Sequence, residues 1–124
     1  MLHELEIKDI LLIKRLTLEF SSGLNAFTGE TGTGKSILLD CLGFALGARG
    51  QASMVRDGME RGEVVAVFST KRYRKVNLIL DKADIPKSGE LIIRRVNFSD
   101  GRKAAWVNDK RVSSDFLRYL GGNL

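Results

Sequence analysis

The sequence predicts an α/β fold in which a mixed sheet, antiparallel in part, packs against one helix that follows a glycine-rich loop. Three observations lead to this fold class. A short apolar strand runs into the loop and an apolar helix runs out of it, period-two alternation marks paired strands near the start, and a hairpin pattern occupies the second half. A second parallel strand does not follow the first helix promptly, so the βαβαβ order of a doubly wound sheet is not expected.

The chain begins with two predicted strands, residues 2–8 and 16–20, in which apolar and polar side chains alternate. Such alternation indicates strands with one buried face, and their closeness in sequence predicts that they pair. A turn at 21–23 leads to a short apolar stretch, 24–27, which has the character of a buried strand. These elements bring the chain to the glycine-rich loop.

The loop fits the pattern G-x-x-x-x-G-K-[ST] without a mismatch. Glycines let the backbone curl with its N–H groups inward, and the helix that follows adds unpaired N–H donors and the positive end of its dipole. The lysine supplies an ammonium for the β- and γ-phosphates, and the serine hydroxyl is placed for Mg²⁺. The predicted nucleotide-binding residues are Gly29, Glu30, Thr31, Gly32, Thr33, Gly34, Lys35 and Ser36, and Ser36 is also the predicted metal ligand. The alternative is a glycine-rich turn that matches by chance.

The helix after the loop is predicted from Gly34 to about Leu46, with Gly47 as its stop signal. Cys41 lies in the apolar stripe of this helix and is interpreted as a small core residue, with a reactive thiol as the alternative. It is the only cysteine, so no internal disulfide is possible, and His3 is the only histidine. A metal site built on histidine and cysteine is therefore excluded.

The chain then changes to loop-like sequence over 48–62 and to a strand over 63–70. Alternate positions of this strand are apolar on both faces, so both faces are expected to be covered. A short helix is predicted at 76–81, and the chain leaves it before Pro86.

A hairpin is the clearest prediction in the second half. Its strands are 90–98 and 103–107, connected through 100–101, whose Asp-Gly pair favours a tight turn. A final short helix is predicted after an N-cap at Ser113 or Ser114.

Composition indicates one globular domain of 124 residues that is 44% hydrophobic, with a net charge of +5 from 20 Lys and Arg against 15 Asp and Glu. No apolar run approaches the ~20 residues needed to cross a bilayer, and the start has no basic leader followed by an apolar segment. A cytoplasmic protein without a membrane partner is therefore expected.

The basic excess lies after residue 70 and suits a polyanionic partner. The set consists of Lys71, Arg72, Arg74, Lys75, Arg94, Arg95, Arg102, Lys103, Lys110 and Arg111, with Tyr73 and Trp106 among them. It supports a second hypothesis, a nucleic-acid-binding module whose phosphate loop is incidental. The simpler interpretation is a solvated charged surface.

These motifs together resemble the RecN family of bacterial DNA repair ATPases, relatives of the SMC proteins with an ABC-type head. The resemblance spans essentially the whole chain and is most specific at 5–8, 28–38 and 42–47, where Glu30-Thr31 is closer to RecN than to SMC proteins. Further similar segments are 55–58, 90–95 and 101–108. One departure is Asp109, where the family turns on glycine; we expect it to alter the hairpin and not the chemistry.

The resemblance implies a P-loop NTPase head of ABC/SMC type, of which residues 1–124 are the N-terminal lobe. Such a head binds ATP and Mg²⁺, dimerises with a second head around two nucleotides, and acts on DNA in double-strand break repair and recombination. An arginine beyond the first helix reaches toward nucleotide or DNA, and Arg56 matches it best, with Arg49 second. A solvated loop arginine is the alternative for both. A bacterial, nucleoid-associated location is implied.

The family continues into a glutamine-bearing loop, a coiled coil, a signature motif and the Walker B carboxylates. No four apolar residues followed by Asp-Glu occur after residue 36, and phosphoryl transfer depends on a carboxylate that positions the nucleophile. We therefore expect an ATPase in the complete protein, with the C-terminal half of the head as a partner. For this chain alone we expect no appreciable hydrolysis, with Lys35 assisting only phosphate stabilisation. The head of another SMC-like, DNA-associated ATPase is the alternative assignment.

Overall fold

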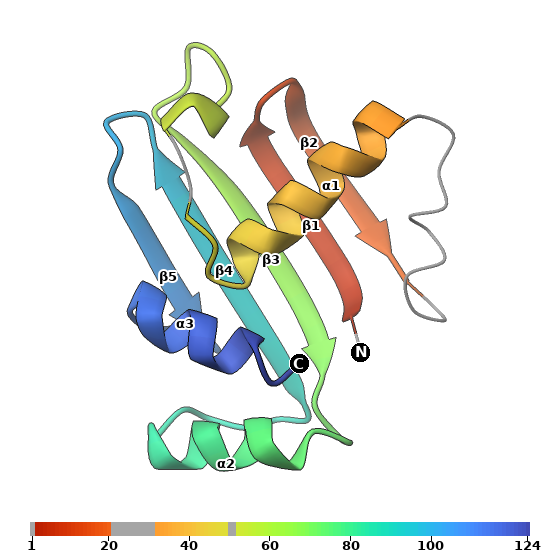
Figure 1. Ribbon diagram of the computed structural model, residues 1–124, viewed down its shortest axis with the longest axis vertical. Coiled ribbons are helices and arrows are strands. Elements are labelled where there is room, and N and C mark those ends of the chain that lie inside the picture. The colour runs from red at the N-terminus through yellow and green to blue at the C-terminus, as the bar shows by residue number, and fades with distance from the viewer. Residues whose placement is uncertain (1, 21–31, 50–51) are drawn as a thin grey trace.

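The computed structural model describes residues 2–20, 32–49 and 52–124, and these form one sheet with helices across one face and at one end (Figure 1). The sheet has six strands in the order β2-β1-β3-β4-β5-β6, and every pairing among them is antiparallel. The strands are β1 Leu2–Ile10, β2 Ile13–Glu19, β3 Arg61–Ser69, β4 Glu90–Phe98, β5 Lys103–Val107 and β6 Lys110–Arg111. The helices are α1 Gly32–Ala45, α2 Arg74–Lys82 and α3 Ser114–Gly121, with a 3-10 turn, η2, at Ala52–Met54.

Strands β1 and β2 confirm the two strands predicted from alternation, and both are longer than predicted. Leu5 and Ile7 of β1 are buried, while Glu6 between them is half-buried, because successive side chains of a strand point to opposite faces. The strand predicted at 24–27 lies outside the described residues.

Strand β3 confirms the strand predicted at 63–70, but the expected coverage of both faces is wrong. Val64, Ala66 and Phe68 are buried, whereas Val65 and Val67 on the other face are only half-buried. The reason is the placement of the helices, since the described helices α1 and α3 cross the same face and α2 lies at one end of the sheet (Figure 1). The second face of β3 therefore has no layer over it in the described part of the chain.

The hairpin of β4 and β5 and the helix α3 form as predicted. Gly101 adopts a φ of +94° in the connecting turn, which glycine accepts without strain. Asn108 and Asp109 also have positive φ, 47° and 68°, and turn the chain into β6 without a glycine. Ser113 is the N-cap of α3, and its hydroxyl accepts a hydrogen bond from the Phe116 N–H at 3.1 Å.

The end of α1 crosses α3 at very close range. Gly47 has a φ of +105°, and a Cβ there would lie 2.8 Å from the backbone nitrogen of Arg118. A Cβ on Gly121 would likewise lie 2.8 Å from the Leu46 carbonyl oxygen. Glycines at both positions let the two backbones touch, so the C-terminal end of α1 is fixed against α3.

Helix α2 and the segment 48–62 also differ from the predictions. Helix α2 begins at Arg74 rather than at 76, so two residues of the basic run lie in its first turn. The segment 48–62 contains η2, and Val55 forms a bridge to Ile10 at the end of β1. This segment is therefore paired to the end of β1 rather than being only a loop.

Candidate functional site

The phosphate-loop motif runs directly into helix α1. The helix begins at Gly32, two residues earlier than predicted, so Gly32, Thr33, Gly34, Lys35 and Ser36 share its first turns. No acidic residue lies in the first turn, so no carboxylate of that turn neutralises the positive end of the helix dipole. This is the backbone arrangement that an anion-binding helix start requires. Gly29, Glu30 and Thr31, the rest of the predicted set, lie outside the described residues.

The other end of α1 is anchored by a buried arginine. Arg95 is 1% exposed; its Nη1 donates to the Phe44 carbonyl oxygen at 3.2 Å and its Nη2 to the Ser114 Oγ at 3.3 Å. Its guanidinium also lies 4.6 Å from the centre of the Phe44 ring. Burial, and to a lesser degree the nearby Arg118, lowers the pKa of Arg95 below its ordinary value. Arg95 thus joins the C-terminal end of α1 to the start of α3.

Cys41 lies on the buried face of α1 and confirms its interpretation as a core residue. It is free and 0% exposed. Burial, with a smaller effect of Asp40, raises the pKa of the thiol to about 11. The thiol is therefore protonated at neutral pH and is a poor nucleophile.

Arg56, the arginine predicted to reach the nucleotide or DNA, is held against the end of β1. Its backbone N–H donates to the Asp9 carbonyl oxygen at 2.8 Å, and its Nη1 lies 3.5 Å from Asp9 Oδ1. Its side chain is 32% exposed. A Cβ on Gly62 would lie 2.6 Å from the Asp9 carbonyl oxygen, so glycine is needed where β3 passes this point. Arg56 is therefore positioned by the fold and still reaches solvent.

Arg49, the second choice, is exposed, and no hydrogen bond or ion pair of its side chain is found among the described residues. Asp9 was missed by the sequence reasoning, since it lies far from Arg56 in sequence and no local pattern connects the two. In Figure 1 the turn between β1 and β2, the turn η2 and the beginning of α1 all lie toward the same end of the view.

Apart from Arg111, the basic residues of the predicted set divide into two groups, and the side chains of the first group bind other residues of the chain. Arg94 forms an ion pair with Glu63 and lies 4.6 Å over the Trp106 ring, while Lys110 Nζ donates to the Ala83 carbonyl oxygen at 2.7 Å. The engaged group is Arg94, Arg95, Arg102, Lys103 and Lys110.

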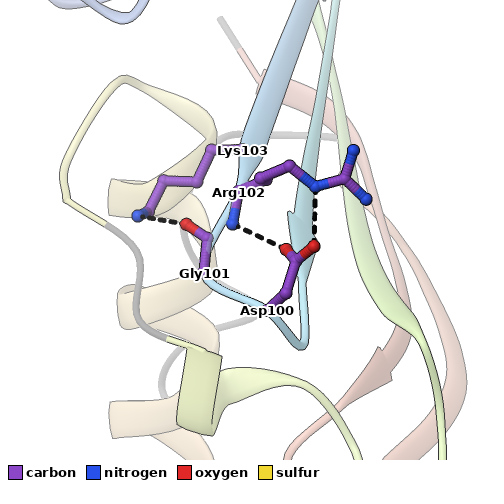
Figure 2. A network of polar contacts seen from close by, with 4 residues as sticks. All are labelled: Asp100, Gly101, Arg102 and Lys103. Atoms are coloured by element: carbon purple, nitrogen blue, oxygen red, sulfur yellow. Dashed lines mark hydrogen bonds and ion pairs between the residues drawn. The ribbon is translucent and has the colours of Figure 1, made fainter.

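Arg102 and Lys103 of this group hold the hairpin turn (Figure 2). Arg102 Nε donates to Asp100 Oδ2 at 2.7 Å, and Lys103 Nζ donates to the Gly101 carbonyl oxygen at 3.1 Å. The Arg102 backbone N–H also donates to Asp100, and this hydrogen bond is the main cause of a lowered Asp100 pKa. The charged groups of Arg102 and Lys103 therefore bind residues of the turn itself.

The second group is the run at the start of α2, which we call the α2 basic cap: Lys71, Arg72, Arg74 and Lys75. All are exposed, and within the described residues none of their side chains forms a hydrogen bond or an ion pair. Tyr73, between them, is half-buried against the core. Arg111, from the same predicted set, is exposed and lies 5.1 Å over the Trp106 ring.

Two other kinds of site are missing from the part of the chain that the structure describes. It contains no group of three or more His, Cys, Asp or Glu residues that could hold a metal ion. None of its helices is both long enough and apolar enough to span a bilayer.

Comparison with known sequences gives one family and one set of relatives. The model of the family described as "AAA domain" matches residues 4–118. The DNA repair protein RecN of Vibrio cholerae is 40% identical over 121 residues, which are 98% of this chain and 22% of that protein. RecN of Bacillus subtilis is 37% identical over 122 residues, which are 98% of this chain and 21% of that protein. The chain thus spans about a fifth of the length of these relatives.

Comparison with solved structures gives the fold. A chain from a study of ATP-driven dimerisation and DNA-stimulated activation of SMC ATPases superimposes with a TM-score of 0.75 at 24% identity, over 98% of this chain and 78% of that one. An Smc head bound to the C-terminal winged-helix domain of ScpA superimposes with a TM-score of 0.73 at 20% identity, over 98% of this chain and 40% of that one. The recombination mediator protein RecF superimposes with a TM-score of 0.68 at 20% identity, over 94% of this chain and 29% of that one. These similarities confirm the predicted P-loop head fold.

Proposed function

The chain belongs to the AAA domain family as a RecN-like member, and we propose on that basis that it is the ATP-binding lobe of a DNA repair ATPase head. The observation that carries the proposal is the complete G-x-x-x-x-G-K-[ST] motif ending in the first turns of α1. The motif lies where an anion would meet the N–H groups of the first helical turn and the positive end of the helix dipole. A phosphate ligand is favoured by both features.

The residue roles follow from that placement. The loop backbone and Lys35 bind the β- and γ-phosphates, and Ser36 is the protein ligand to Mg²⁺. The group that binds the triphosphate is Gly29, Glu30, Thr31, Gly32, Thr33, Gly34, Lys35 and Ser36. Arg56, held by Asp9 at the end of β1, is an additional cation for the nucleotide or for DNA.

The complete protein is proposed to hydrolyse ATP, and this chain is proposed to bind it without appreciable turnover. A carboxylate that positions the attacking water is required for phosphoryl transfer, and no Walker B sequence follows residue 36 in this chain. The proposed partners are the C-terminal half of the head, a second head joined through nucleotide, and DNA. The names of the relatives support the assignment to DNA repair.

The test is equilibrium binding of ATP to the chain with and without Mg²⁺. Lys35→Ala should weaken binding about 10- to 100-fold, since a hydrogen bond between charged partners contributes about 1.5–3 kcal/mol. Ser36→Ala should reduce only the part of the affinity that depends on Mg²⁺. Lys14→Ala, which removes an exposed lysine of β2, is the matched control. Equal affinities for the wild type and Lys35→Ala would contradict the proposal.

A further inference from the structure

The α2 basic cap stands out because its charges have no role in holding the fold. Lys71 and Arg72 lie in the connection from β3, Arg74 and Lys75 lie in the first turn of α2, and all of these side chains are exposed without a partner in the described residues. Two shallow surface hollows meet here, and Lys71 and Arg72 line both of them. The nearby Asp81 does not neutralise the patch, because it pairs with Lys87 at 2.6 Å.

The position of these charges argues against an ordinary solvated surface. The start of a helix carries the positive end of its dipole, so cations there repel it, whereas acidic residues would be favourable. Helix α2 has no acidic residue in its first turn, and its N-cap residue, Tyr73, makes no side-chain capping hydrogen bond. The charges therefore oppose the helix that carries them. An external anion that approaches the patch removes this repulsion.

We propose that the α2 basic cap is a contact surface for the phosphate backbone of double-stranded DNA. The proposal rests on the function proposed above, that the chain is part of a DNA repair head. Lysine and arginine bind phosphate oxygens without reading sequence, so the contact is sequence-independent. Duplex is favoured over single-stranded DNA because single strands need an exposed aromatic surface for base stacking, and Tyr73 is half-buried against the core.

The contact is separate from the nucleotide site. In Figure 1, α2 lies at the end of the sheet away from the beginning of α1. DNA binding by the cap therefore does not need the phosphate loop to be occupied. This separation makes the two proposals independently testable.

The experiment measures the affinity of the chain for a fluorescently labelled duplex of random sequence over a series of salt concentrations. The test variant carries Lys71→Gln, Arg72→Gln, Arg74→Gln and Lys75→Gln. The control variant removes as many exposed charges elsewhere, through Lys8→Gln, Lys14→Gln, Arg15→Gln and Arg61→Gln. Each lost phosphate contact should reduce the slope of log K against log salt by about 0.9, so the test variant should lose roughly 2 to 4 units of slope. The control should keep most of the slope.

Two further readouts separate this proposal from a structural role and from the proposed function. Because the cap opposes the helix dipole, the test variant should melt at the same temperature as the wild type or at a higher one, and a lower melting temperature would contradict the proposal. The test variant should bind ATP as tightly as the wild type does. Lys35→Ala should lose affinity for ATP and keep its affinity for duplex DNA. If Lys35→Ala keeps its ATP affinity, the nucleotide proposal fails and the DNA result still stands.

Three results would overturn the DNA contact. The first is an equal loss of affinity in the test and control variants, which indicates non-specific attraction to net charge. The second is poly-glutamate binding to the cap as tightly as duplex, which indicates an acidic protein partner instead. The third is the absence of duplex binding by the wild type at low salt.

Discussion

The two groups of basic residues have the same chemistry and opposite relations to the fold. In the engaged group the cationic side chains donate to carbonyl oxygens or carboxylates of their own chain, as Arg95 does to Phe44 and Lys110 to Ala83. In the α2 basic cap the corresponding N–H groups meet solvent. The difference shows that net charge alone does not identify a binding surface. Only charges that the fold leaves unused are available to a partner.

The largest effect on stability is expected for Arg95→Met. The substitution leaves the Phe44 carbonyl and the Ser114 hydroxyl without their buried donor, and it separates α1 from α3. Loss of buried hydrogen-bond partners together with imperfect packing should reduce the free energy of unfolding by about 3 kcal/mol. Urea unfolding followed by circular dichroism measures it. Arg94→Met is the matched control, since Arg94 is partly exposed and its ion pair should contribute less than about 1 kcal/mol. Equal losses of unfolding free energy in the two variants would contradict the larger contribution assigned to the buried Arg95.

A smaller effect is expected for Lys110→Met. Lys110 Nζ donates to the Ala83 carbonyl oxygen, where the last turn of α2 leaves carbonyl groups without helical partners. Removing this donor should destabilise the chain by about 1 kcal/mol. Lys82→Met, in the last turn of the same helix, removes an exposed lysine with no partner in the described residues and should cost less. Thermal melts of both variants measure the difference. A larger loss of stability for Lys82→Met would contradict the role assigned to Lys110.

The smallest effect in the engaged group is expected at the hairpin turn. The pKa of Asp100 is lowered chiefly by the Arg102 backbone N–H, so its contribution to stability is present above the ordinary carboxyl pKa and is lost as pH falls through the lowered value. The carboxyl is fully exposed, and the change should be hard to detect in melts. NMR titration of the Asp100 carboxyl is therefore the measurement. Arg102→Gln keeps the backbone N–H and removes only the smaller side-chain contributions, so it should raise the Asp100 pKa part of the way to the ordinary range. A full return to that range would contradict the assigned main cause.

Local patterns in the sequence were enough for most of the sheet. Alternation predicted β1 and β2, the Asp-Gly turn predicted the hairpin of β4 and β5, and Ser113 was one of two predicted caps of α3. These features depend on neighbouring residues only. The coverage of β3 was predicted wrongly because it depends on where distant helices pack.

The candidate site likewise combines features that local sequence predicts with features that depend on distant segments. The phosphate motif is contiguous, so the sequence shows it whole. The ion pair of Arg56 with Asp9 joins distant segments and could not be predicted. Arg95 was grouped with the surface charges, although its spacing from the buried Leu91 and Ile93 gave a usable signal, since all three alternate on one face of β4. The start of α2 was placed late because its charged first turn hides the helical pattern of Val76 and Leu80.

The most direct test compares the two groups in one experiment. Each is neutralised separately by changes to Gln. The cap variant changes Lys71, Arg72, Arg74 and Lys75, and the engaged variant changes every member of the engaged group except the buried Arg95, namely Arg94, Arg102, Lys103 and Lys110. Duplex affinity and the free energy of unfolding are then measured for both variants. We predict that the cap variant loses duplex affinity and keeps its stability, whereas the engaged variant loses stability and keeps most of its affinity. Equal loss of affinity in both would show that total charge, and not its relation to the fold, determines binding.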